Sequence, residues 1–163
     1  MTGTRSVVVV GIGNELRGDD GAGLEVVRRL RRAGLPAEIS IRAHDGEGLG
    51  LLELWEGADA VLLVDAVRSP APPGRIHSLD LSCVTAPASL GSASSHAIGV
   101  VEAIELGRTL GRLPGRVLLY GLEGERFEVG SSISAVLTRE LDLLTELVRR
   151  QALRLLADAA WCP

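Results

Sequence analysis

Two short runs of apolar, mostly β-branched residues constrain the fold of this chain more than any other feature. The first is the run of four valines at 7–10, and the second is Ala-Val-Leu-Leu-Val-Asp at 60–65. A strand that is apolar on both sides is typical of a parallel sheet that helices cover on both faces. Both runs therefore predict buried central strands of such a sheet.

Strand-like and helix-like segments alternate along the rest of the chain. Three more segments read as strands, at 37–43, 75–79 and 117–120. Apolar residues recur at helical spacing in four segments, at 24–31, 49–55, 97–104 and 137–148. This alternation predicts an α/β fold, a three-layer sandwich in which a twisted, mostly parallel sheet of about five strands has helices on both faces. We expect a single domain over residues 1–163, with its core at about 5–150.

The composition excludes several classes of protein. The 163 residues are 46% hydrophobic, and the net charge of −4 comes without the basic stripe that a nucleic-acid-binding domain needs. No segment reaches the ~20 apolar residues that span a bilayer, and no secretory signal is visible. The cysteines, Cys83 and Cys162, have no CxxC partner and predict no disulfide framework. We expect a cytoplasmic protein with neither nucleic acid nor membrane as a partner.

Three polar residues follow expected strands and are candidates for a metal site: Asp20, Asp65 and His96. In open α/β sheets, sites form at the carboxyl ends of the strands, so one edge would bring all three together. Two carboxylates and an imidazole suit nickel, zinc or a similar divalent ion, and three protein ligands leave positions open for catalysis. Each residue alone also has a structural explanation, Asp20 as a helix cap, Asp65 in an Asx turn and His96 as a helix-start residue bonded to the backbone.

A glycine-rich segment after the first strand offers a rival interpretation. Gly-Ile-Gly at 11–13 is similar to a dinucleotide-binding loop, but Leu16 stands where the third glycine should be. Asp19 and Asp20 also place negative charge where a pyrophosphate would bind. The chain lacks the phosphate-binding GxxxxGK(S/T) loop, the HExxH helix of many metallopeptidases and the GxSxG elbow of serine hydrolases. These absences make a nucleotide site or a serine hydrolase site a weak hypothesis.

Three further residues with reactive side chains receive minor roles. Cys83 has no base beside it and is interpreted as a packing or surface residue. His77 lies in an expected strand and is interpreted as structural. His44 lies near the same sheet edge as Asp45 and could add a polar group to the site.

Four segments, taken in order, resemble the motifs of hydrogenase maturation proteases. The first covers 11–23 and has the family's pattern of Gly-x-Gly-Asn after a strand, a short spacer, two acidic residues and a nearby glycine. The others are His-Asp-Gly at 44–46, Val-Asp-Ala at 64–66 and Ser-His at 95–96 before an apolar helix. The resemblance covers about residues 5–150.

This resemblance implies an activity and roles for particular residues. Members remove the C-terminal extension of a nickel–iron hydrogenase large-subunit precursor after nickel has been inserted into it. The family's three metal ligands, which serve a metal-dependent endopeptidase, match Asp20, Asp65 and His96. The family's substrate-recognition turn matches Asp45 and Gly46, to which we add Asn14 of the first motif. The implied partner is the precursor itself, which would also supply the nickel.

The chain departs from the family pattern in two places, and another function remains open. Many members have Asp-Gly-Gly-Thr in the recognition turn, where this chain has Asp-Gly-Glu-Gly at 45–48. The first ligand is glutamate in some members and is the shorter Asp20 here. The same ligands would also serve a non-catalytic nickel-binding assembly factor that docks on the precursor without cutting it.

Overall fold

The computed structural model describes residues 5–83 and 97–158, and its centre is a five-stranded sheet. The strands lie in the order β2-β1-β3-β5-β4, and β4 alone runs antiparallel to its neighbour β5. Their bounds are Val7–Ile12 for β1, Ile39–His44 for β2, Ala60–Val67 for β3, Ile76–Asp80 for β4 and Arg116–Glu123 for β5. The prediction of a mostly parallel sheet is confirmed.

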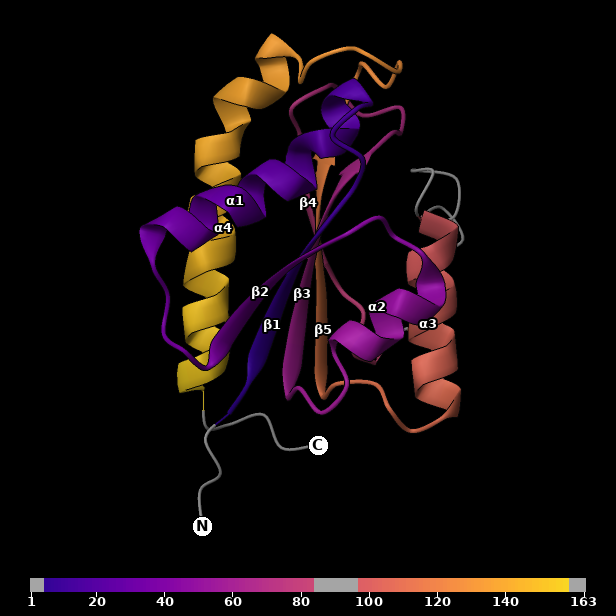
Figure 1. Cartoon of the computed structure of the whole chain (residues 1–163), viewed down its shortest axis with the longest axis vertical. Coiled ribbons are helices and arrows are strands. Elements are labelled where there is room, and N and C mark those ends of the chain that lie inside the picture. Colours follow the sequence, from indigo (N-terminus) through magenta and orange to yellow (C-terminus); the bar gives the residue numbers. More distant parts are fainter. Residues whose placement is uncertain (1–4, 84–96, 159–163) are drawn as a thin grey trace.

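Helices cover both faces of the sheet (Figure 1). A short 3-10 helix, η1 (Gly18–Gly21), leads into α1 (Ala22–Ala33), which packs on one face together with α4 (Ala135–Ala157). The other face carries α2 (Gly48–Leu54) and α3 (Ala97–Thr109). The predicted three-layer sandwich is therefore confirmed. Among the described residues, no helix combines the length and the apolar character needed to cross a bilayer.

The two apolar runs, at 7–10 and 60–65, form the middle of the molecule. Every residue of β1 and of β3 is buried. Because successive side chains of a strand point to opposite faces, Leu62 joins the core under α1 and α4, whereas Leu63 joins the core under α2 and α3. The sheet is thus the shared wall of two apolar cores.

One strand is longer than the sequence indicates. We expected Asp65 at the end of its strand, but β3 continues through Ala66 to Val67. The reason is pairing with β5, which extends in parallel register as far as Val67 opposite Glu123. Asp65 is therefore held within a paired strand and not in a turn, so the Asx-turn explanation for this residue is wrong.

The connections around β1 place a topological switch point at the carboxyl edge of the sheet, between β1 and β3, and this place is called the crevice below. Helix α1 leads from β1 to β2 on one face, and α2 leads from β2 to β3 on the other. Since β2 and β3 lie on opposite sides of β1, the strand order reverses between β1 and β3. Open α/β sheets bind their ligands at such a point. Asp20 follows β1, and Asp65 lies near the end of β3.

Candidate active site at the carboxyl edge of the sheet

Asp20 is held in η1 at the start of the crevice. Its side chain is 1% exposed, and its Oδ2 accepts a hydrogen bond of 3.1 Å from the backbone N–H of Asn14. The Asn14 side chain in turn accepts one of 2.9 Å from the N–H of Leu16 through its Oδ1. The loop after β1 is therefore folded around the Asp20 carboxylate. Asn14, a predicted recognition residue, shapes this loop while its side chain stays exposed.

Asp19 has a different role from its neighbour. It is fully buried, and its Oδ2 accepts hydrogen bonds of 2.9 Å from the N–H groups of Glu125 and Arg126. Its Oδ1 accepts one of 2.6 Å from the N–H of Ser134, the residue that caps α4. Asp19 thus ties the loop after β5 and the start of α4 to the Asp20 segment.

Two glycines allow η1 and α1 to lie directly on the end of β1. A Cβ on Gly13 would overlap the carbonyl oxygen of Asp20, and the residue has a φ of +148°. A Cβ on Gly11 would overlap the carbonyl oxygen of Gly23 in α1. This close backbone approach explains why Gly11 and Gly13 of the first motif are glycines.

Asp65 lies on the sheet face that α2 and α3 cover. Its side chain is 3% exposed and, by strand alternation, points to the same face as Leu63. Gly121 lies beside it on β5, and His77 lies beside Gly121 on β4. Asp20 and Asp65 are thus both buried at the carboxyl edge, Asp20 in η1 after β1 and Asp65 within β3.

Some predicted residues lie outside the described part of the chain. These are His96, which is the expected third ligand, Ser95 of the same motif, and Cys162. Helix α3 begins at Ala97, directly after His96. Among the described residues, no group of three or more histidine, cysteine, aspartate or glutamate side chains is arranged to hold a metal ion.

The predicted recognition turn is held by hydrogen bonds within it. The N–H of Gly46 donates to Nδ1 of His44 at 2.9 Å, and Oδ1 of Asp45 accepts from the N–H of Glu47 at 3.1 Å. The Asp45 side chain itself is 78% exposed. Glu47, which departs from the family pattern, caps α2 by accepting from the N–H groups of Leu49 and Gly50.

A pocket of about 390 Å³ joins this turn to the loop after β1. It lies between α1 and the ends of β1 and β2 and brings together two of the predicted recognition residues, Asn14 and Asp45. Side chains of both charges line it, and Arg28 spans part of its wall with an ion pair of 3.4 Å to Glu15. The lining residues are Gly13, Asn14, Glu15, Leu24, Arg28, Arg31, Ala43 and Asp45.

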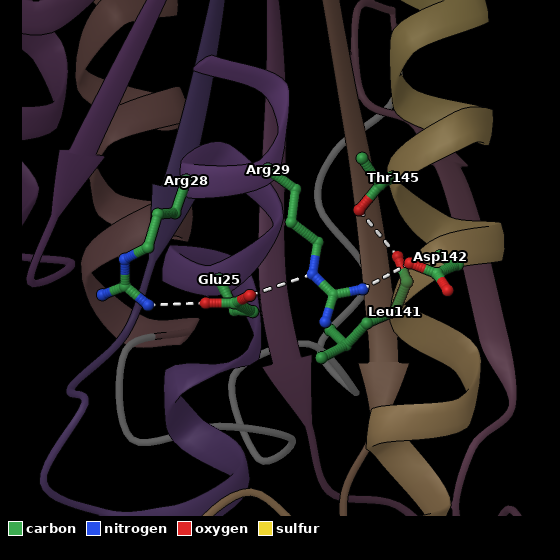
Figure 2. A network of polar contacts seen from close by, with 6 residues as sticks. All are labelled: Glu25, Arg28, Arg29, Leu141, Asp142 and Thr145. Carbon is green, nitrogen blue, oxygen red and sulfur yellow. Dashed lines mark hydrogen bonds and ion pairs between the residues drawn. The ribbon is translucent and has the colours of Figure 1, made fainter. Parts of the chain in front are cut away.

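The wall of this pocket is braced by a polar network between α1 and α4 (Figure 2). The Glu25 carboxylate forms ion pairs of 2.5 Å with Arg28 and 2.9 Å with Arg29. Arg29 forms a further ion pair of 2.6 Å with Asp142 on α4. Burial raises the pKa of Glu25, but the hydrogen bonds and positive charges of Arg29 and Arg28 outweigh it and lower the pKa overall. Thr145 bonds to the carbonyl of Leu141 within α4.

A further buried carboxylate at this edge, Glu123, was not expected from the sequence. Glu123, which is 1% exposed, accepts hydrogen bonds from Nε2 of His77 and Oγ of Ser69, each at 2.9 Å, and from the N–H of Ser69. Ser69 and His77 both contact Glu123 and form no serine–histidine relay. The network fixes the start of β4, which supports the structural interpretation of His77. No sequence motif signals it, because its members come from three separate segments.

Comparisons with known proteins agree with this geometry. The family model described as hydrogenase maturation protease matches residues 24–151. HupD of Rhodobacter capsulatus, a hydrogenase expression/formation protein, is 31% identical over 146 residues, which is 88% of this chain and 70% of that protein. HupD of Bradyrhizobium diazoefficiens is 31% identical over 118 residues, 72% of this chain and 62% of its own length.

The fold comparison gives the same result. The solution structure of an endopeptidase from Escherichia coli superposes with a TM-score of 0.82 and 26% identity, over 91% of this chain and 92% of that one. The match to the family model spans most of the chain, including Asp65 and the turn at 45–48. By sequence and by fold, this chain belongs to the hydrogenase maturation protease family.

Proposed function

We propose that this protein is an endopeptidase that removes the C-terminal extension of a nickel–iron hydrogenase large-subunit precursor once nickel has been inserted. The observation that carries the proposal is the pair of buried carboxylates, Asp20 in η1 after β1 and Asp65 within β3, at the point where the strand order reverses. Membership of the family supplies the reaction, and the carboxylates supply a reason for the precursor to bind at this edge.

The proposed metal ligands are Asp20, Asp65 and His96, and the metal is nickel that the precursor carries. Carboxylate oxygens with one imidazole nitrogen form a donor set that suits nickel or a similar divalent ion. Binding the nickel of the precursor would hold the adjacent segment at the crevice and so raise its effective concentration there. An empty precursor would lack this anchor, so cleavage would wait for nickel insertion.

The pocket beside the crevice is the proposed site for the segment to be cut. Asp45 offers an exposed carboxylate at one side, Asn14 lies at the other, and Gly46 shapes the turn between His44 and Glu47. The pocket contains both arginine and acidic side chains, which suits a polar peptide segment better than an apolar one.

Mass spectrometry of intact protein tests the proposal directly. A nickel-loaded and a nickel-free precursor are each incubated with the wild-type protein and with the His96→Ala, Asp65→Asn and Asp59→Asn variants. Asp59 precedes β3 at the opposite edge, where it binds Ser6, so Asp59→Asn is a matched control. We expect loss of a C-terminal peptide only from the nickel-loaded precursor, and only with wild type and the control.

The other outcomes have definite meanings. Equal cleavage of both precursors would remove the coupling to nickel. Near-normal cleavage by His96→Ala would remove that residue from the ligand set. An intact precursor in a stable complex with the wild-type protein would instead identify a non-catalytic assembly factor.

A further inference from the structure

Two arginines of α1 line the pocket beside the crevice, and they differ in how their charge is used. Leu24, Arg28 and Arg31 follow one another at helical spacing, so one face of α1 forms this wall. Arg28 forms ion pairs of 2.5 Å with Glu25 and 3.4 Å with Glu15, and Figure 2 shows the first of them. The positive charge of Arg28 is therefore already balanced within the protein.

The charge of Arg31 is not balanced in this way. Among residues 5–83 and 97–158 its guanidinium forms no ion pair, and its Nη2 donates a hydrogen bond of 3.2 Å to the carbonyl oxygen of Ile41. The Asp45 carboxylate, which also lines the pocket, contacts His44 and the N–H of Glu47 instead. A guanidinium has several N–H donors, and the bond to a neutral carbonyl uses one of them. The exposed side chain of Arg31 can thus meet a ligand that enters the pocket.

The bond to Ile41 holds Arg31 at the open edge of the sheet. Strand β2 is the first in the sheet order, and β1 is its one neighbour within the described part of the chain. The carbonyls of Glu38 and His44 accept hydrogen bonds from the β1 segment, so the carbonyl of Ile41 points away from β1. Because this bond already orients the guanidinium, a ligand does not have to order the whole side chain when it binds.

We propose that Arg31 is a specificity-determining residue, which binds a carboxylate of the precursor segment that lies in the pocket. This inference rests on the proposed function, since it names the chemistry that the pocket recognises. A carboxylate accepts two parallel N–H groups from a guanidinium, and such charge-assisted bonds are stronger than a bond to a carbonyl. The carboxylate belongs either to an acidic side chain near the cut or to the C-terminus of the extension, and the experiment separates these two sources.

The neighbouring Arg32 provides a matched control. It lies on the same helix, is exposed, and is outside the set of described residues that line the pocket. Arg32→Ala removes the same charge from the same turn, so a general loss of electrostatic attraction affects it as much as Arg31→Ala. Arg31→Lys keeps the charge without the planar fork, and Arg31→Glu reverses the charge. Thermal melting checks that each variant is folded.

The experiment measures kcat and KM for nickel-loaded precursor at low and at high salt. We expect KM to rise by about 10-fold for Arg31→Ala with little change in kcat, because the lost interaction is a charge-assisted bond made on binding. Arg31→Lys should lie between wild type and Arg31→Ala. Added salt should raise the KM of wild type and of Arg32→Ala more than that of Arg31→Ala, since salt screens the charge pair.

Two variants of the precursor identify the carboxylate. In one, the aspartates and glutamates of the extension and of the residues just before the cut are changed to their amides, and in the other the C-terminal carboxylate is an amide. One of the two should raise the KM of wild type by about 10-fold and leave the KM of Arg31→Ala unchanged, because that bond is already lost. Where a side chain is the source, lysine in its place should restore binding to Arg31→Glu.

The results that would overturn the inference are distinct from a failure of the proposed function. If wild type cleaves but Arg31→Ala and Arg32→Ala have equal KM values, the proposed function stands and the inference falls. It also falls if neither precursor variant changes the KM of wild type. If wild type cleaves no precursor, the proposed function fails, and the Kd for precursor decides: Arg31→Ala must raise it by about 10-fold and Arg32→Ala must not. Wild type that binds no precursor would overturn both.

Discussion

Asp19 and Asp20 are adjacent, buried and acidic, yet their surroundings separate their roles. Asp19 binds the N–H groups of Glu125, Arg126 and Ser134, whereas Asp20 binds the N–H of Asn14 beside the crevice. The sequence shows an acidic pair and cannot divide these roles. The partners of Asp19 lie 106 to 115 residues further along the chain, so only the folded structure identifies them.

This division predicts opposite results for two substitutions. Asp19→Ala should destabilise the fold by about 3 kcal/mol, because buried N–H groups lose a charged acceptor. Asp20→Asn keeps an oxygen for the N–H of Asn14, so we expect a loss of less than about 1 kcal/mol. Cleavage of nickel-loaded precursor should nevertheless disappear in Asp20→Asn. Urea unfolding followed by circular dichroism measures both stabilities, and equal destabilisation by the two changes would contradict the division.

Glu47 offers a second test at the scale of the residue. It accepts hydrogen bonds from two N–H groups in the first turn of α2, so Glu47→Ala should cost about 1 kcal/mol of stability. Glu47→Gln keeps an acceptor and should cost less. Because the side chain is used for this cap, processing of the precursor should change little in either variant. A large rise in KM with unchanged stability would instead make Glu47 a recognition residue.

At the scale of the element, the sequence predicts best the strands that consist of a continuous apolar run, because such a run indicates burial without any knowledge of distant residues. The valine run becomes β1, and the apolar run at 60–65 becomes most of β3. The last residues of β3 and the direction of β4 were not predictable, because both depend on β5, which begins at Arg116. The length and direction of these strands are set by pairing with residues far along the chain, which local β-propensity does not reveal.

The contact between α1 and α4 should depend on pH through Glu25. The lowered pKa of Glu25 in the folded state means that its stabilisation is present above the unfolded value of 4.5 and is lost as the pH falls through the folded value. Solvent screens pairs this close to the surface, so Glu25→Gln should cost only about 0.5–1 kcal/mol at pH 7. The difference in unfolding free energy between wild type and Glu25→Gln should shrink as the pH falls from 5 to 3.

Urea unfolding at several pH values checks this expectation. Glu38→Gln is a suitable control, because Glu38 is exposed and forms none of the ion pairs found among the described residues. Its effect should be small and constant over the same range. A cost of Glu25→Gln that stays constant down to pH 3 would show that charge on Glu25 contributes nothing to the contact.

At the scale of the whole molecule, the sheet is a wall between two cores, and this predicts one cooperative unit. Leu62 and Leu63 are adjacent, both fully buried, and point into opposite cores. Leu62→Ala and Leu63→Ala should each cost about 3 kcal/mol, since each leaves a cavity that the packed layers cannot close. Neither change touches the crevice, so processing per folded molecule should be retained.

Trp55 makes the test of cooperativity possible. It is fully buried in the core under α2 and α3, whereas circular dichroism reports helices on both faces. In a Trp161→Phe background, its fluorescence and the circular dichroism should give one coincident urea transition, in wild type and in both leucine variants. Because β3 belongs to both cores, damage to either face should shift both signals equally. A fluorescence transition that Leu62→Ala leaves in place while the circular dichroism shifts would mean that the two layers unfold separately, and the single-domain expectation would then fail.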